Sequence, residues 1–234
     1  MNRREFNSVS LPVLSVWLGL SSGAAQALSL ADLSQGEASR GLKTALEQGA
    51  KAAVMQLGKA DGFLGNEKVR IPLPGYLNEA ASLLRTLGQG ARLDELVTAM
   101  NRAAEAAVPQ ARDLLLGAVR SMSISDAKKI LSGGDTSVTA FFSEKTRAPL
   151  SQKFLPAVTR STEKVGLADK YNQIAGKAAE LGLVRREDAS IQQYVTGKAL
   201  DGLYFMIGEE ERKIRRDPVG SGSAVLSKVF GALK

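Results

Sequence analysis

The sequence contains no cysteine and no histidine in its 234 residues. These two absences exclude disulfides, thiol nucleophiles, imidazole acid–base catalysis, Ser-His-Asp triads and zinc sites of the usual kind. Aromatic residues make up only 5% of the chain, and no basic stripe with interleaved aromatics indicates a nucleic-acid-binding surface. Carboxylates, amides and basic side chains are therefore the candidates for function, and we expect no nucleic-acid partner.

The composition favours a helical protein with a basic surface. Hydrophobic residues make up 44% of the chain. Alanine and leucine dominate them, and both lose little side-chain freedom in a helix. Positive and negative residues alternate along the chain, and their net charge of +7 is typical of a solvated helical surface with a basic excess. We predict an all-α fold: a single multi-helix, bundle-like domain with a sizeable core.

The first 27 residues have the pattern of a signal peptide. Arg3 and Arg4 precede a short apolar run from Leu11 to Leu20, and small residues follow up to Ala27. The run is too short to span a bilayer stably, so we predict export to the periplasm and cleavage after Ala27. The arginine pair also resembles a twin-arginine signal, and both export routes stay open. We expect a helical domain over residues 28–218 and an amphipathic C-terminal tail over 219–234.

Capping residues, glycines and prolines divide the rest of the chain into predicted helices. Ser123 and Asp126 form a capping-box pattern, and Asp135 and Asp188 are placed to cap two later helices. Pro149 is predicted to open a further helix, because proline is tolerated in a first helical turn. The expected helices cover residues 34–57, 74–88, 93–122 with a break at Pro109, 124–131, a segment after Asp135, 149–166, 167–182 and 188–216.

One short segment is predicted to be extended, and the last helix is predicted to be central. Residues 71–74 read Ile-Pro-Leu-Pro, and two prolines at alternate positions force an extended backbone. The last helix is apolar on two faces, so we expect it to be buried against the Leu93–Met122 segment. At its end, we expect ion pairs between residues four apart, namely Glu209–Lys213 and Glu211–Arg215.

Four long segments of the chain resemble a known bacterial family. They read LGKADGFLGNEKVRIPLP, MNRAAEAAVPQA, MSISDAKKILSGGDTSVTAFF and YVTGKALDGLYFMIGEEERKIRRDP. The resemblance is to a family of secreted proteins described as a domain of unknown function, DUF 4197, and it extends from about Gly41 to Phe230. The stretch Thr136-Ser137-Val138-Thr139 departs slightly from the family's pattern. The resemblance implies a helical exported protein, and it carries over no activity, ligand or catalytic residue.

Asn101, Arg102 and Glu105 are the first candidate binding residues. They lie at the edge of an apolar helix face, and Arg102 and Glu105 are one turn apart, where opposite charges pair. Beside an apolar face, these groups would hold an anionic or polar ligand. Alternatively, an ion pair and an amide would tie this helix to a neighbouring segment, which is the simpler interpretation.

Two further groups of polar residues are candidates. Asp126 and Asp135 flank a Gly-Gly turn and would act as a carboxylate pair on a glycan or, as we favour, as helix caps. Lys198 and Asp201 lie a turn apart on an apolar helix, where charges must be paired or face a cavity. The end of the same helix adds Glu210, Glu211 and Arg215. Turn formation explains the oxygen side chains of residues 61–67 without a metal. We predict no metal, no cofactor and no catalytic residue.

Three functions from different classes remain open. The preferred one is a non-enzymatic binding or scaffold protein of the cell envelope, whose partner is an envelope protein or a small ligand. The tail over 219–234 would permit peripheral membrane contact. The second is a carboxylate-dependent hydrolase acting on envelope glycans or polymers, which requires several of the candidate carboxylates to converge. The third is a carrier of lipid or another apolar ligand, which requires a large apolar cavity.

Overall fold

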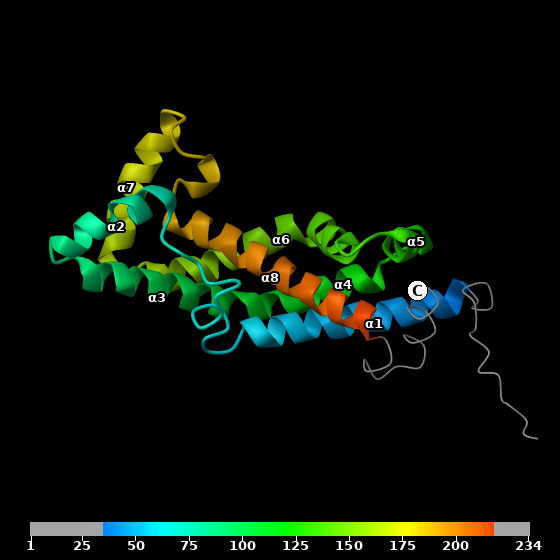
Figure 1. Ribbon diagram of the computed structural model, residues 1–234. Helices are drawn as coiled ribbons and strands as arrows, with labels where there is room; N and C mark the ends of the chain where they lie inside the picture. The colour runs from blue at the N-terminus through cyan, green and yellow to red at the C-terminus, as the bar shows by residue number, and fades with distance from the viewer. Residues whose placement is uncertain (1–34, 218–234) are drawn as a thin grey trace, which may run out of the picture.

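Eight α-helices make up most of the part of the chain that the computed structural model describes, residues 35–217 (Figure 1). They are α1 (Gln35–Leu57), α2 (Gly75–Thr86), α3 (Gly90–Ala107), α4 (Arg112–Arg120), α5 (Ile124–Ser132), α6 (Ser137–Thr162), α7 (Gly166–Glu180) and α8 (Ile191–Arg216). Two short 3₁₀ helices, η2 (Val108–Ala111) and η3 (Arg186–Asp188), complete the list, and no strand occurs within residues 35–217. The predicted all-α fold is confirmed. The predicted signal peptide (1–27), the tail (219–234) and the Ser34 cap lie outside the described residues.

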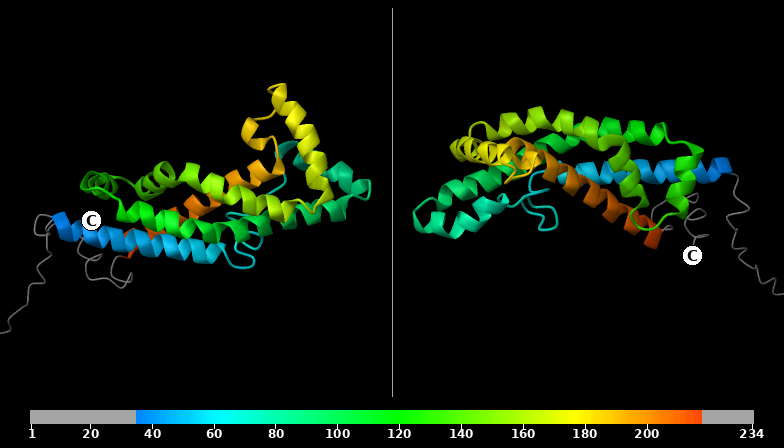
Figure 2. Two further views of the ribbon diagram at one scale, coloured as in Figure 1. Left: turned by 180° about the vertical axis from the view of Figure 1, so that it is seen from behind. Right: turned by 90° about the horizontal axis from the view of Figure 1, so that it is seen from above.

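The core lies where the long helices run side by side. α8 packs chiefly against α6 and α1 and also contacts α3, while α3 packs along α6 and α4 packs along α1. In both figures, α2 and α7 lie at one end of the molecule and α5 lies at the other (Figures 1 and 2). The expected contact between the last helix and the Leu93–Met122 segment is present, although α6 and α1 are its main neighbours. The largest fully buried side chains include Phe63, Phe142, Phe154, Leu96 and Met100.

Small residues on α1 allow a close approach to α8. Gly41, Ala45, Gly49 and Ala53 recur every four residues, and all four are buried. A Cβ atom added at Gly49 would lie 3.5 Å from the Cβ of Glu210 on α8. The two backbones are therefore close at this point, because the small side chains of α1 leave room for α8.

The predicted helix caps are right in one case and wrong in two. Ser123 and Asp126 form a full capping box at the start of α5. Asp135 does not cap α6, because the N-cap position belongs to Thr136, which makes no side-chain hydrogen bond there. Asp188 does not cap α8. It lies in η3, and Ser190 accepts the hydrogen bond from the Gln193 amide.

Pro149 does not open a new helix, because α6 continues through both Pro149 and Pro156. A proline within a helix removes the hydrogen bond to the carbonyl four residues earlier. These carbonyls belong to Lys145 and Gln152, both of which are exposed, so water can supply the missing donors. The other side of α6 carries an uninterrupted row of buried residues, Phe142, Leu150, Phe154 and Val158. Burial of this row outweighs the two lost hydrogen bonds.

Pro109 interrupts the long segment that begins at α3, as predicted. Residues 108–111 form the 3₁₀ helix η2 between α3 and α4, and Val108 and Ala111 in it are buried. The predicted extended segment over residues 71–74 has no helical structure, and Pro74 at its end has extended backbone angles of φ −57° and ψ 150° before α2 begins. None of the helices within residues 35–217 combines the length and apolar character that a bilayer crossing requires.

Candidate functional site

Asn101 and Glu105 on α3 hold the loop between α1 and α2. The Asn101 side chain accepts a hydrogen bond from the Ile71 amide at 2.8 Å and donates to the Ile71 carbonyl at 2.9 Å. Glu105 Oε1 accepts hydrogen bonds from the amides of Phe63 and Leu64 at 3.0 and 3.1 Å. Asn101 and Glu105 are buried, so they satisfy loop amides that water cannot reach.

Arg102 completes this contact on the solvent side. Its guanidinium donates to Glu105 Oε2 at 2.7 Å and to Asp61 Oδ1 at 2.8 Å. The two carboxylates raise the pKa of Arg102, mainly through these hydrogen bonds. The three residues therefore act as a clamp between α3 and the loop, which is the simpler of the two interpretations drawn from the sequence.

Asp126 and Asp135 lie at opposite ends of α5. Asp126 accepts hydrogen bonds from the Ser123 amide and hydroxyl at 3.0 and 2.7 Å, and these bonds lower its pKa. Asp135 is an exposed residue in the turn before α6. Asp126 thus serves its own capping box, and Asp135 contributes no cap.

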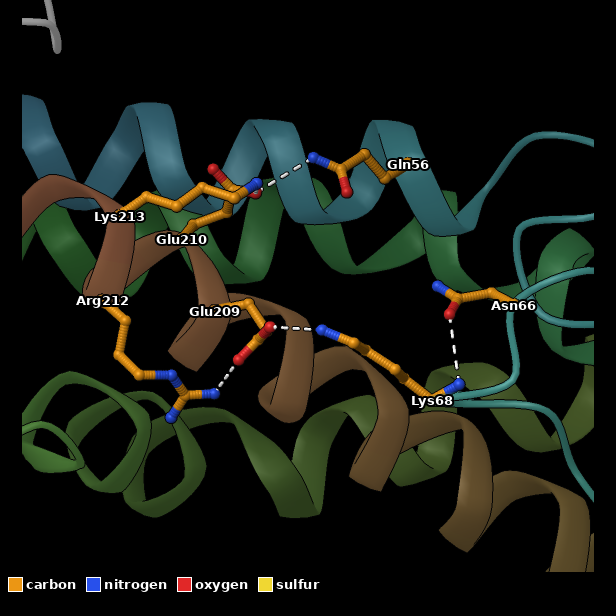
Figure 3. Close-up of polar contacts among 7 residues, drawn as sticks. All are labelled: Gln56, Asn66, Lys68, Glu209, Glu210, Arg212 and Lys213. Atoms are coloured by element: carbon orange, nitrogen blue, oxygen red, sulfur yellow. Dashed lines mark hydrogen bonds and ion pairs between the residues drawn. The ribbon is translucent and has the colours of Figure 1, made fainter.

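Two acidic residues near the end of α8 connect this helix to α1 and to the loop (Figure 3). Glu209 binds Lys68 of the loop at 2.8 Å and also pairs with Arg212. Glu210 accepts hydrogen bonds from Gln56 of α1 at 3.0 Å and from Lys213 at 2.6 Å. The predicted pair of Glu209 with Lys213 is wrong, because Lys213 pairs with Glu210, three residues earlier. The hydrogen bonds from Lys68 and Arg212 lower the pKa of Glu209 to about 2.

Glu211 and Arg215 form the predicted pair, in which Glu211 is buried and Arg215 is half-buried. Glu211 Oε1 accepts hydrogen bonds from Nε and Nη2 of Arg215 at 2.9 and 2.8 Å. Arg215 Nη2 also donates to the Ile130 carbonyl and to the Ser137 hydroxyl, which joins α8 to α5 and α6. Burial raises the pKa of Glu211, and the arginine opposes that shift.

A small apolar cavity adjoins Glu211. It has a volume of about 20 Å³, and its walls include Ala45, Phe142 and Ile214. Glu211 Oε2 has no hydrogen-bond partner among residues 35–217. A cavity of this size holds one water molecule, which suits an orphaned carboxylate oxygen.

A much larger groove lies between α6, α8 and the segment that precedes α8. Its volume is about 820 Å³. Lys198 and Asp201 line it, together with Tyr194 and Leu200 on α8 and Ser143 and Arg147 on α6. Arg185, Arg186 and Asp188 form its third wall. A Cβ atom added at Gly197, which also lines the groove, would meet no atom within 4 Å, so the space beside this part of α8 is open.

Most charged side chains in the groove are paired. Arg147 Nη2 donates to Asp201 Oδ1 at 2.7 Å, and its guanidinium carbon lies 5.2 Å from the centre of the Tyr204 ring. Arg185 donates to Asp188 at 2.8 Å. The Lys198 ammonium lies 5.8 Å from the centre of the Tyr194 ring. The groove therefore has two cations with defined positions: Lys198, which lies over the Tyr194 ring, and Arg147, which pairs with Asp201.

Two hydroxyl groups add to the polar character of the groove. Tyr194 donates to the Pro72 carbonyl at 3.2 Å, and burial together with Asp188 raises its pKa to about 12, so it stays a donor at neutral pH. Thr196 is buried, and its hydroxyl has no hydrogen-bond partner within residues 35–217. A buried polar group without a partner costs about 1–3 kcal/mol.

A family model described as "Protein of unknown function (DUF4197)" matches residues 32–231. The chain belongs to the DUF4197 family. No curated protein and no solved structure gave a significant match to it. The resemblance drawn from the sequence segments is thus confirmed for nearly the whole chain, and it brings no ligand or activity with it.

The groove of this DUF4197 protein includes residues that sequence reasoning missed. Lys198 and Asp201 were candidates because they are charges on an apolar helix, but Arg147, Arg186 and Thr196 were not. Arg147 lies 54 residues before its partner Asp201, and no local pattern connects the two. Among residues 35–217, no group of three acidic side chains is arranged to hold a metal ion. The side chains that line the groove offer hydrogen bonding and charge pairing.

Proposed function

We propose that this DUF4197 protein is an exported, non-enzymatic binding protein of the cell envelope. Its ligand is a small polar molecule with a carboxylate or phosphate group, bound in the groove between α6, α8 and residues 185–188. The observation that carries the proposal is the presence of Lys198 and Arg186 in a groove of about 820 Å³ whose acidic residues already have partners. The signal-peptide pattern of residues 1–27 supports export.

The charge balance of the groove favours an anion. Its three carboxylates are each paired: Asp201 with Arg147, Asp188 with Arg185, and Glu144 with Lys145. Lys198 and Arg186 are the cations that remain after this pairing. A carboxylate or phosphate between them would form charge-assisted hydrogen bonds, which are about twice as strong as neutral ones.

Uncharged polar side chains also line the groove. Ser143, Ser151 and Gln193 lie in its walls together with the charged side chains. A polar, multifunctional ligand therefore suits the groove better than an apolar one.

The positions of the carboxylates support binding in preference to hydrolysis. Glu105 is bonded to loop amides, Asp126 to Ser123, Glu210 to Gln56 and Lys213, and Glu211 to Arg215. Each of these carboxylates thus has a structural task, on α3, at the start of α5 or near the end of α8, whereas glycoside hydrolysis needs two of them to face one substrate. The cavity beside Glu211, at about 20 Å³, is too small for a lipid chain.

Calorimetric titration with defined anions tests the proposal. The probes are inorganic phosphate and citrate, with glucose as the uncharged control, and the protein is the chain from Leu28 onward. We expect both anions to bind and glucose not to bind. Lys198→Met should raise the Kd of the anions roughly tenfold or more, because a charge-assisted hydrogen bond is lost.

Lys153→Met is the matched control for this titration. Lys153 is also a lysine on a long helix next to the groove, but it is exposed and does not line the groove. Its substitution should leave the Kd unchanged. Equal weakening by both substitutions would mean that the anions sense only the net charge, and the proposed site would be wrong.

A further inference from the structure

The groove between α6, α8 and residues 185–188 extends along several helical turns. On α6, its lining residues Ser143, Arg147, Ser151 and Leu155 recur every four residues. These positions span about 18 Å of helix axis, because each residue of an α-helix adds about 1.5 Å. The groove therefore has room for a ligand that extends along the two helices.

α6 and α8 run in opposite directions along the groove (Figure 1). Near one end, Ser137 of α6 donates a hydrogen bond to Glu211 of α8 at 3.4 Å. Farther along, Arg147 of α6 donates to Asp201 of α8 at 2.7 Å. Residues later in α6 therefore lie beside residues earlier in α8. Leu155 is about two turns beyond Arg147, so it is level with the first turns of α8.

Two cations without a carboxylate partner among the described residues lie at different levels of the groove. Arg186 lies in η3, before α8 begins at Ile191, and it is exposed. Lys198 lies farther along α8, separated from Ile191 by about 10 Å of helix axis. Its ammonium lies 5.8 Å from the centre of the Tyr194 ring, so the side chain is directed back towards η3. The two charges are therefore placed to hold the two ends of one extended ligand.

Leu155 provides apolar surface between these two levels. Its side chain is 38% exposed and lines the groove. Because Leu155 is level with the first turns of α8, it lies between Lys198 and η3. A chain of CH₂ groups at this point would remove the apolar surface of Leu155 from water.

We propose that the ligand of the groove is a linear dianion, an apolar chain with a carboxylate or another anionic group at each end. One end binds Lys198, the other end binds Arg186, and the chain between them covers Leu155. This inference rests on the proposed anion-binding function and gives each of the two cations its own anionic group. The three carboxylates that line the groove already have cationic partners, so a dianion neutralises the two positive charges that remain.

Calorimetric titration at low ionic strength with three acids tests this arrangement, again with the chain from Leu28 onward. Suberate has a carboxylate at each end of its chain. Octanoate has a chain of the same length with one carboxylate, and succinate has two carboxylates on a much shorter chain. We expect suberate to bind about tenfold more tightly than either of the others, because only suberate reaches both cations.

Substitutions assign the two ends and the chain. Arg186→Met should raise the Kd of suberate about tenfold and change that of octanoate less than about twofold, because octanoate can still use Lys198. Leu155→Gln should weaken suberate but not succinate, since only the longer chain covers this position. Arg160→Met is the matched control, because Arg160 is an exposed arginine on α6 that does not line the groove. Circular dichroism checks that each variant keeps its helices.

Three results would overturn the linear dianion. Suberate that binds no more tightly than octanoate and succinate, while these bind through Lys198, would exclude a two-ended ligand and leave the anion-binding groove in place. Equal weakening of suberate by Arg186→Met and Arg160→Met would mean that it senses only the net charge. Absence of binding by all three acids, and by phosphate and citrate as well, would contradict the proposed function and this inference with it.

Discussion

Removal of the Glu105 carboxylate should destabilise the protein strongly. Glu105 is 5% exposed and accepts two hydrogen bonds from loop amides and one from Arg102. Hydrogen bonds to a charged group contribute about 1.5–3 kcal/mol each, and an amide left buried without an acceptor costs about 1–3 kcal/mol. We therefore expect Glu105→Ala to lower the free energy of unfolding by about 3–5 kcal/mol, within the range found for broken buried pairs.

Urea denaturation measures this change, and hydrogen exchange locates it. The unfolding midpoint should fall, and exchange of the Phe63 and Leu64 amides should accelerate well beyond that of the amides of α6. Glu95→Ala, an exposed glutamate on the same helix, is the control and should change the free energy of unfolding by less than about 0.5 kcal/mol. A loss below about 1 kcal/mol for Glu105→Ala would refute the clamp as a source of stability.

Three further predictions concern α8. Glu209 has a folded pKa of about 2 and an ordinary value of 4.5, so it stabilises the fold above pH 4.5, and this contribution is lost as the pH falls towards 2. The urea midpoints of wild type and Glu209→Gln should accordingly converge over that interval. Arg215→Met leaves Glu211 as a buried, unpaired charge and should lower the free energy of unfolding by about 3–5 kcal/mol, measured by thermal or urea unfolding. Adding Glu211→Gln should recover part of this loss, and no recovery would contradict the assigned pair. Gly197→Ala should raise the free energy of unfolding by up to about 1 kcal/mol, because alanine favours the helix and its Cβ meets no atom within 4 Å. A destabilised variant would mean that the groove is closed at this point.

Local patterns predicted much of the fold. The capping box of α5 and the break at Pro109 depend on residues within a few positions of each other, and both are as expected. Asp135 and Asp188 were predicted as caps, but Thr136 and Ser190 occupy those positions. Aspartate, threonine and serine all suit an N-cap, so residue type alone does not distinguish neighbours that are one or two positions apart.

Errors of a second kind arise where tertiary packing overrides a local rule. Pro149 is a sound helix-start signal, yet the buried row of α6 extends on both sides of it and holds the helix together. Lys213 donates a hydrogen bond to Glu210, which also accepts one from Gln56 of α1. The packing of α1 against α8 therefore favours the Glu210–Lys213 pair over the predicted Glu209–Lys213 pair. Neither effect is visible in the sequence of one helix.

The candidate site required contacts that are distant in sequence. Asn101 was a sound candidate for a polar contact, but its partner, Ile71, is 30 residues away and offers only backbone atoms. Lys198 and Asp201 were predicted to be paired or to face a cavity, and the structure places both beside the groove. The other walls come from α6 and from residues 185–188, which only the packed helices bring together.

Mapping of an anion titration onto backbone amides tests the proposed groove most directly. The protein is labelled with ¹⁵N, and citrate and inorganic phosphate are added in turn. We predict saturable shifts confined to the amides of residues 143–151, 185–188 and 193–201, and loss of these shifts in Lys198→Met but not in Lys153→Met. Shifts spread over all exposed lysines, or the same shifts in both variants, would contradict an anion-binding groove between α6 and α8.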